Sequence, residues 1–356
     1  MKTTSLPVFC LLLAACANQA PAPPPTGPGL EHLRERGDVQ TSPLACVTAE
    51  ANPLAPPRDA EALAFAEGVW LVDSRRDPAA FGGEGGSERI RAVASIQPIL
   101  WGAGFVEYYT GAWDGQLMLG TSFWGAAGGL NRWVVVETNT ASGALSSLRG
   151  RFQPGEGFSM QGELFGRRAE LRLSDIEADS FEWSLSFAGD DDPAWTRRYT
   201  RLENLAAAND ALGRLIADNA PLDEVAGIQP FSFWPGEWDW IEHHLDVVDC
   251  AGGQAQVQWT NGGQAIEELV ISSYLPEEAG QDVYNDYSLT VWNAESGEFE
   301  NFWWTTGLSA PLFSSGVCEV VDGQKNCYLR ARFSPSEDED YIEWETDGIL
   351  IEWFRK

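Results

Sequence analysis

The sequence predicts an all-β protein made of two tandem small antiparallel barrels joined by a helix. Three observations support this. Short runs alternate apolar and polar residues, most clearly at residues 180–187, as half-buried strands do. Turn pairs such as Asp114-Gly115 and Asp322-Gly323 separate the runs, and many short strands between regular turns form sandwiches or barrels. A plan that opens on Gly-x-Trp occurs twice.

The first fifteen residues have the anatomy of an export signal. Lys2 is followed by an apolar run over residues 6–15, which is shorter than the roughly 20 apolar residues of a membrane-spanning helix. The run ends in Leu13-Ala14-Ala15-Cys16, which resembles the bacterial lipobox, where the peptidase cuts before the cysteine that becomes acylated. We therefore expect a lipid on Cys16. Ordinary signal cleavage around Ala15-Cys16-Ala17 is the alternative.

Five prolines between residues 18 and 29 predict a stiff, extended spacer between the lipid and the folded body. Position 17 is Ala, whereas in the lipoproteins that the motif resembles an Asp there commonly marks retention at the inner membrane. We expect the protein to belong to the cell envelope, lipid-anchored in the outer membrane and facing the periplasm.

The repeated plan shows the same features in the same order in both copies. A short helical stretch at residues 59–67 precedes the first Gly-x-Trp, and residues 231–235 precede the second. The paired features, first copy before second, are Gly68-Val69-Trp70 and Gly236-Glu237-Trp238, Trp133 and Tyr287, Arg172 and Arg332, and Tyr199-Thr200-Arg201 and Trp353-Phe354-Arg355.

Apolar residues at helical spacing separate the two copies, from Leu202 to Ile216, and the run ends before Pro221. We therefore divide the chain into a signal peptide at 1–15, the lipidated cysteine and proline-rich spacer at 16–57, a first barrel at 58–204, a connecting helix at 205–228 and a second barrel at 229–356.

A helical turn before Gly-x-Trp and an aromatic-x-Arg on the last strand resemble the calycin superfamily of lipocalins, fatty-acid-binding proteins and nitrobindins. In that superfamily the early Trp and the late Arg stack across the closed end of the barrel. The resemblance implies two barrel-closing pairs, Trp70 with Arg201 and Trp238 with Arg355. Each cation–π contact is worth about 0.5 to 2 kcal/mol.

The resemblance also implies a small hydrophobic ligand, or haem in nitrobindins. Haem needs an axial ligand, usually His, and the chain offers only His32, His243 and His244. The nitrobindin extension of Gly-x-Trp is absent, so we expect no cofactor. A net charge of −30 repels the nucleic-acid backbone and excludes nucleic acid as a partner. We leave protein partners and oligomeric state open.

Four cysteines remain after Cys10 leaves with the signal and Cys16 takes the lipid. If Asp322-Gly323 form a tight hairpin turn, Cys318 lies opposite Cys327 where two antiparallel chains approach closely, which predicts a disulfide. This leaves Cys46 for Cys250. Free thiols or a metal site are the alternatives, although the spacings fit no common zinc pattern.

Sixteen tryptophans, concentrated in the second copy, suggest ligand binding, although large aromatic side chains are the normal filling of small β domains and a core role is favoured for any single one. Our candidate ligand-binding residues are Trp292 and the adjacent Trp303 and Trp304. Because neighbours on a strand point to opposite faces, one of that adjacent pair must face away from whatever the other packs against.

The Asp347-Gly348 turn places Glu343 opposite Glu352, and like charges across a ladder need a partner. They are candidates for a divalent-cation site, and the alternative is two splayed, solvated carboxylates or an intervening arginine. The sequence contains no G-x-S-x-G motif and no other catalytic signature, so we name no catalytic residue.

From the sequence we expect a membrane-anchored periplasmic lipoprotein that binds a small apolar or amphipathic ligand in a barrel. The alternative is a non-catalytic interaction or structural module of the cell envelope. A third hypothesis is a hydrolase that uses carboxylates at the barrel rim.

The anchor predicts the outcome of a single substitution. Cys16→Ala removes the only thiol that the lipobox presents, so acylation should stop. The protein should then appear in the soluble periplasmic fraction or as an uncleaved precursor, measured by membrane fractionation and by metabolic labelling with a fatty acid. Unchanged membrane association would refute the lipid anchor.

Overall fold

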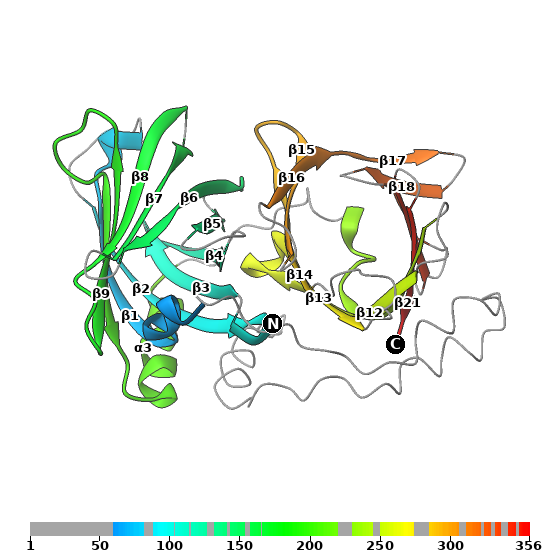
Figure 1. The fold of residues 1–356 in the computed structure, drawn as a ribbon. Helices are drawn as coiled ribbons and strands as arrows, with labels where there is room; N and C mark the ends of the chain where they lie inside the picture. The colour runs from blue at the N-terminus through cyan, green and yellow to red at the C-terminus, as the bar shows by residue number, and fades with distance from the viewer. Residues whose placement is uncertain are drawn as a thin grey trace, which may run out of the picture. The chain divides into compact units, whose positions relative to one another are not determined.

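A computed structural model describes residues 60–356 with gaps at 82–87, 103, 114, 127–131, 141–142, 154–156, 165, 220–229, 245–249, 274–284, 306–310, 322–323, 329–331, 336–340 and 347–348. The predicted signal peptide, Cys16, the spacer and Cys46 lie outside the described residues. The chain divides into two compact units. From residue 60 onward the division falls between residues 223 and 224, except that Gly143–Leu145 are grouped with the second unit. We describe each unit separately (Figure 1).

The first unit is a closed antiparallel barrel of ten strands, as the sequence predicts. Hydrogen bonds connect the strands in the order β1-β10-β9-β8-β7-β6-β5-β4-β3-β2, so every strand pairs on both sides. Its elements are η2 (Ala60–Ala66), β1 (Gly68–Arg76), η3 (Pro78–Phe81), β2 (Glu88–Ile99), η4 (Leu100–Gly102), β3 (Gly104–Trp113), β4 (Gln116–Ala126), β5 (Arg132–Asn139), β6 (Ser146–Gln153), β7 (Gly157–Leu164), β8 (Arg167–Ser174), β9 (Ser180–Phe187) and β10 (Trp195–Arg201).

Alternation along each strand fills the interior of this barrel. On β9 the apolar side chains of Phe181, Trp183, Leu185 and Phe187 are all buried, while the serines and Glu182 between them are partly exposed. The same period of two places Tyr199 of β10 inside, where its ring stacks on Phe181 at 4.2 Å between ring centroids.

Arg201 and Trp70 close one end of the first barrel. They face each other across β1 and β10, and the guanidinium carbon lies 4.2 Å from the centroid of the indole ring. Arg201 also donates hydrogen bonds to the carbonyls of Phe65, Glu67 and Ala178 at 2.7, 2.6 and 3.1 Å. The Trp70 indole N–H donates to the Ala66 carbonyl at 2.8 Å. Together these bonds tie the end of η2 to the first and last strands.

The second unit repeats this arrangement. Arg355 faces Trp238, with its guanidinium carbon 4.4 Å from the ring centroid, and donates to the carbonyls of Phe233 and Pro235 at 2.6 and 2.9 Å. The Trp238 indole N–H donates to the Trp234 carbonyl at 2.8 Å. The arginines therefore satisfy carbonyls at the same turn in both copies.

The same contacts explain why the motif begins with glycine. A Cβ atom on Gly68 would collide with the Arg201 guanidinium, and one on Gly236 would lie 2.5 Å from Nη1 of Arg355. Glycine provides the space for the guanidinium, and the tryptophan two residues later provides the ring on which it stacks.

The second unit is an eleven-stranded antiparallel sheet in the order β16-β15-β14-β13-β12-β11-β21-β20-β19-β18-β17. Its two ends, β16 and β17, are consecutive in the chain and separated by Val317 alone, so one interrupted strand fills the place that β6 fills in the first barrel. Its elements are β11 (Gly236–His244), β12 (Cys250–Thr260), η6 (Asn261–Gly263), β13 (Ala265–Ser273), β14 (Asn285–Asn293), β15 (Glu298–Thr305), β16 (Leu312–Gly316), β17 (Cys318–Val321), β18 (Gln324–Tyr328), β19 (Arg332–Pro335), β20 (Tyr341–Thr346) and β21 (Ile349–Arg355).

The strand order corrects one part of the sequence repeat. Trp133 lies on β5, the fifth strand of its unit, whereas Tyr287 lies on β14, the fourth. The pairing of Trp133 with Tyr287 was therefore wrong. Both residues lie ten positions before the glycine of a Ser-Gly turn, but that turn follows the fifth strand in the first unit and the fourth strand in the second. Arg172 and Arg332 do correspond, since each lies on the strand that pairs with the penultimate strand of its unit.

One α-helix, α3 (Leu205–Asp218), connects the units. It begins at Asn204, whose side chain accepts a hydrogen bond from the Ala207 N–H at 3.0 Å. Leu212 and Ala211 pack on Val93 of the first barrel, so the helix buries its apolar stripe there. The sequence extended the helix to residue 228, and residues 220–229 lie outside the described part. No described helix is long and apolar enough to cross a membrane.

The backbone register places Cys318 opposite Cys327 across β17 and β18, as the hairpin argument predicts. The disulfide itself stays a prediction. Cys250 is the first residue of β12, but its expected partner Cys46 lies outside the described residues, so that bridge is untested.

The closing contact makes a stability prediction. Gly68→Ala should lower the free energy of unfolding, because the new Cβ displaces the Arg201 guanidinium and the backbone φ of 139° is strained for alanine. Backbone strain of this kind alone costs about 1 to 3 kcal/mol. Urea denaturation measures the change. Gly213→Ala is the control, since Gly213 lies in α3 with no neighbour near its would-be Cβ, and it should stabilise by about 0.5 to 1 kcal/mol.

Candidate functional site

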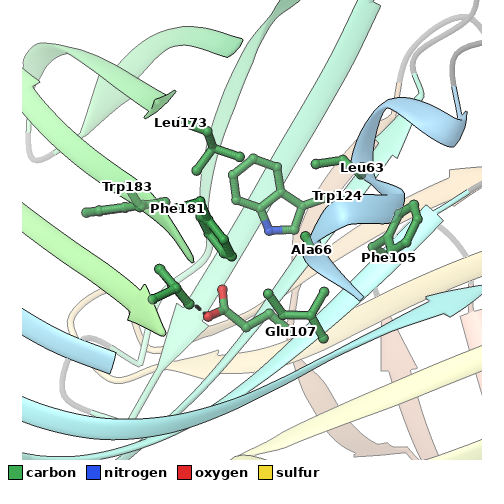
Figure 2. Close-up of a pocket in the computed structure, with 10 residues that line it drawn as sticks. Leu63, Ala66, Phe105, Glu107, Trp124, Leu173, Phe181 and Trp183 are labelled. Carbon is green, nitrogen blue, oxygen red and sulfur yellow. Dashed lines mark hydrogen bonds between the residues drawn. The ribbon is translucent and has the colours of Figure 1, made fainter. Parts of the chain in front are cut away.

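A small interior cavity of about 20 Å³ lies in the first barrel. This volume accommodates about one water molecule and is far below the roughly 300 to 1,000 Å³ of ligand pockets. Figure 2 shows one carboxyl group, that of Glu107, among otherwise mainly apolar side chains. The residues that line the cavity are Leu63, Ala66, Ile96, Phe105, Glu107, Trp124, Leu173, Phe181, Trp183 and Tyr199.

Glu107 lies inside the barrel because it shares a face of β3 with Phe105 and Tyr109, both buried core residues. It is 2% exposed, and its Oε1 accepts a hydrogen bond from the Tyr199 hydroxyl at 2.8 Å. The Ser122 side chain also hydrogen-bonds to this carboxyl group. Glu107 is therefore buried, held from two strands, and in contact with the cavity.

Arg197 lies next to this carboxyl group, two residues before Tyr199 on β10. Its Nη2 donates to Glu137 Oε1 at 2.9 Å, and its side chain is 2% exposed. The guanidinium carbon lies 4.2 Å from the ring centroids of both Trp183 and Trp195. The aromatic rings and Glu137 together hold Arg197 in the middle of the barrel.

The pKa values indicate how charge is distributed in this centre. Burial raises the pKa of Glu107, and the opposing effects of Arg197 and of the Tyr199 hydrogen bond do not cancel it. Burial lowers the pKa of Arg197, but the charge of Glu137 and the further effects of Tyr199, Tyr109 and Glu107 together raise it by more, so the guanidinium stays charged. Burial raises the pKa of Tyr109 to about 12, and this phenol keeps its proton. The centre thus holds one ion pair and one carboxyl group that favours its neutral form.

Among the buried polar atoms of this centre, Nε of Arg197 lacks a hydrogen-bond partner. Its N–H donates to no oxygen of the described residues. Buried donors are nearly always satisfied by protein or ordered water, so such an atom marks a place where a water or a ligand oxygen fits. A buried guanidinium, a carboxyl group and a cavity together are the usual signs of a functional site.

The carboxyl group and its serine occur in both units at the same register. The Ser288 hydroxyl donates to Glu268 Oε2 at 2.6 Å, as Ser122 hydrogen-bonds to Glu107. Counting across the strands from the Gly-x-Trp glycine gives Gly68, Ile96, Glu107 and Ser122 in the first unit and Gly236, Val257, Glu268 and Ser288 in the second.

The ion pair, by contrast, belongs to the first unit alone. Counting back four residues from each closing arginine gives Arg197 in one unit and Ile351 in the other. Across from each serine stand Glu137 in the first unit and Trp303 in the second. Both partners of the ion pair are replaced together, as expected if neither charge is tolerated in a buried site without the other.

The three tryptophans predicted to bind ligand are distributed over two faces of the second sheet. Trp292 packs edge-on against Phe299, a core residue, at 4.8 Å between ring centroids. Trp303 shares the face of β15 that carries Phe299, and Trp304 occupies the opposite face, where it is 1% exposed. The structure therefore places Trp292 and Trp303 toward the interior and Trp304 away from it.

Glu343 and Glu352 face each other across β20 and β21, as the turn predicts. The backbone register is described but their side chains are not, so a cation site there remains untested. Within the described residues, no three His, Cys, Asp or Glu side chains gather as a metal site would require.

Glu107 and Arg197 are not among the site residues predicted from the sequence. A signal for each was present, because Glu107 interrupts the apolar face of a strand that also carries Phe105 and Tyr109. Arg197 likewise shares the face of β10 that carries Trp195 and Tyr199. The contacts of Arg197 with Glu137 and of Glu107 with Tyr199 join strands that are far apart in the chain, and spacing alone does not reveal them.

Comparison with known proteins adds little to this geometry. No family model matches the chain, and no curated protein does. The chain is similar to the S-type phycobiliprotein lyase from Guillardia theta, at 9% identity and a TM-score of 0.31, over 40% of this chain and 92% of the lyase. It is also similar to a protein of unknown function of the DUF3598 family from Nostoc punctiforme, at 11% identity and a TM-score of 0.25, over 84% of this chain and 100% of the other. At these scores neither likeness supports an argument about function.

The raised pKa of Glu107 predicts a pH-dependent stability. Because the folded protein holds this proton more tightly than the unfolded chain, stability should fall as pH rises above the ordinary value of 4.5 and level off above the raised pKa. Glu107→Gln should remove that part of the slope, measured by urea denaturation across the pH range. Glu163→Gln, at an exposed position of β7, is the control and should leave the slope unchanged.

Proposed function

We propose that this protein is a lipid-anchored periplasmic binding protein whose first barrel takes a small amphipathic ligand in its interior. The observation that carries the proposal is the cavity that Glu107 and Tyr199 line together with apolar side chains, so that apolar walls meet a buried polar group. A ligand with an apolar body and one polar group matches both parts of that surface.

The location in this proposal rests on the sequence alone. The Leu13-Ala14-Ala15-Cys16 segment supports the attachment of a lipid to Cys16. Position 17 is Ala and not Asp, which supports placement in the outer membrane. The proline-rich segment that follows would hold the folded body away from the membrane surface.

The polar centre favours binding over a purely structural role. Replacing a buried ion pair with apolar residues of similar volume often leaves a protein equally or more stable. The second unit has Ile351 and Trp303 at the positions of Arg197 and Glu137, so this fold accepts apolar residues there. Retaining the charged pair in the first barrel is therefore explained more readily by a ligand than by packing.

The size of the cavity sets a condition on this function. A volume of about 20 Å³ does not hold an amphipathic molecule, so binding requires lining side chains such as Leu63 or Trp124 to move. The same volume favours a second candidate function, in which the barrels are filled by their own side chains and the protein is a non-catalytic interaction module of the envelope.

Native mass spectrometry of the lipidated protein, gently extracted in detergent, distinguishes the two functions. Ile96 lines the cavity, so Ile96→Trp should fill it and remove any co-purifying small molecule. Leu71→Trp places the same side chain at an exposed position of β1 and should retain the molecule. Binding should also change the fluorescence of the wild-type protein, because Trp124 and Trp183 line the cavity.

A bare protein mass, with no change in fluorescence across a panel of fatty acids, esters, ketones and amines, would reject the binding function. That result would leave the interaction module as the better explanation.

A further inference from the structure

We infer that the interior of the first barrel selects a ligand with an uncharged hydrogen-bond acceptor, such as a ketone or ester carbonyl, over carboxylates and amines. This inference rests on the proposed binding function and specifies the head group of the ligand. It follows from which charges in the centre are already balanced and which polar atoms still lack a partner.

The positive charge in the described centre is already balanced by a carboxylate. The only positive group in the described centre is Arg197, and Glu137 already pairs with it at 2.9 Å. Aromatic rings cover the guanidinium as well, with Trp183 and Trp195 at 4.2 Å and Tyr109 at 5.0 Å from its central carbon. The positive charge is therefore neutralised and shielded before any ligand arrives.

The charge of the Glu107 side chain depends on the groups that face it. The groups that face it are Arg197 and Tyr199 from β10, Glu137 from β5 and Ser122 from β4. Because Arg197 is engaged by Glu137 and burial disfavours a second carboxylate, the neutral carboxyl form of Glu107 completes a centre with no net charge. In that form Glu107 can donate one hydrogen bond into the cavity that it lines.

The hydrogen bonds already formed in the centre determine which group a ligand has to supply. The Glu107 carboxyl group already receives hydrogen bonds from Tyr199 and Ser122. A neutral Glu107 adds a donor at the cavity wall. The buried Nε–H of Arg197, which lies outside that wall, also lacks a partner. The centre therefore has hydrogen-bond donors that lack an acceptor. A carbonyl oxygen is an acceptor, whereas an ammonium group is not.

A charged ligand would disturb the balance of charge in this centre. A carboxylate would bring a further negative charge close to Glu137 and to Glu107, with only one guanidinium to balance them. An ammonium group would lie close to the buried positive charge of Arg197, and its own charge would be balanced only if Glu107 gave up the proton that burial favours. Either ion therefore adds charge to a buried site, which is unfavourable.

Three molecules of similar length test the inference on the full-length protein: methyl hexyl ketone, octanoate and octylamine. Dissociation constants come from quenching of tryptophan fluorescence. We expect the ketone to bind at least about tenfold more tightly than either ion, because it adds no charge to the buried centre.

The pH dependence of ketone binding tests the role of Glu107. Above the pKa of Glu107 the dissociation constant should rise about tenfold per pH unit, because only the neutral carboxyl group donates to the carbonyl. Glu107→Gln, which keeps a donor and cannot ionise, should bind the ketone with a pH-independent affinity near that of the wild type at low pH. Glu163→Gln should keep the wild-type profile.

The outcomes separate the inference from the function on which it rests. If none of the three molecules binds and native mass spectrometry shows a bare protein, the binding function itself fails. If octanoate or octylamine binds most tightly at the cavity, the binding function stands and the head-group inference is overturned. Ketone binding that is independent of pH in the wild type would also overturn it, because Glu107 would then not be the donor.

Discussion

Both units depend on one interaction, the stacking of a late arginine on an early tryptophan. The guanidinium covers the indole ring and satisfies carbonyls of the turn before the first strand, at Phe65 and Glu67 in one unit and at Phe233 and Pro235 in the other. It thereby joins the first strand, the last strand and the segment that enters the unit. The absence of a side chain on the motif glycine is what allows this approach.

The closing pair also sets the register from which the interior centre follows. Once Trp70 faces Arg201, the period of two along β10 directs Tyr199 and Arg197 into the same interior, and pairing across β2 and β3 brings Glu107 to meet them. The same register in the second unit places Glu268 and Ser288 at the equivalent point. The shared backbone plan therefore conserves the position of the carboxyl group, while the side chains around it have diverged.

That divergence makes the first barrel the more informative unit for function. It keeps Arg197 and Glu137 at positions where the backbone register of the second unit has Ile351 and Trp303. Buried charges are costly unless each is paired. Here Arg197 pairs with Glu137, and burial raises the pKa of Glu107, which favours its neutral form. If Glu107 is neutral, the centre has no net charge and one additional hydrogen-bond donor, so an uncharged ligand fits it better than an ion does.

The sequence by itself determined the all-β class, the two tandem copies, the helix between them, the motif residues at each closed end and the hairpin register of Cys318 with Cys327. These features depend on short-range periodicity, on turn chemistry and on a motif that repeats. It did not determine the strand correspondence of Trp133, the interrupted sixth strand of the second unit, or the centre around Glu107. Only the tertiary structure decided these, because they depend on how many strands separate two residues around a barrel and on which side chains meet across its interior. Neither quantity is encoded in spacing along the chain.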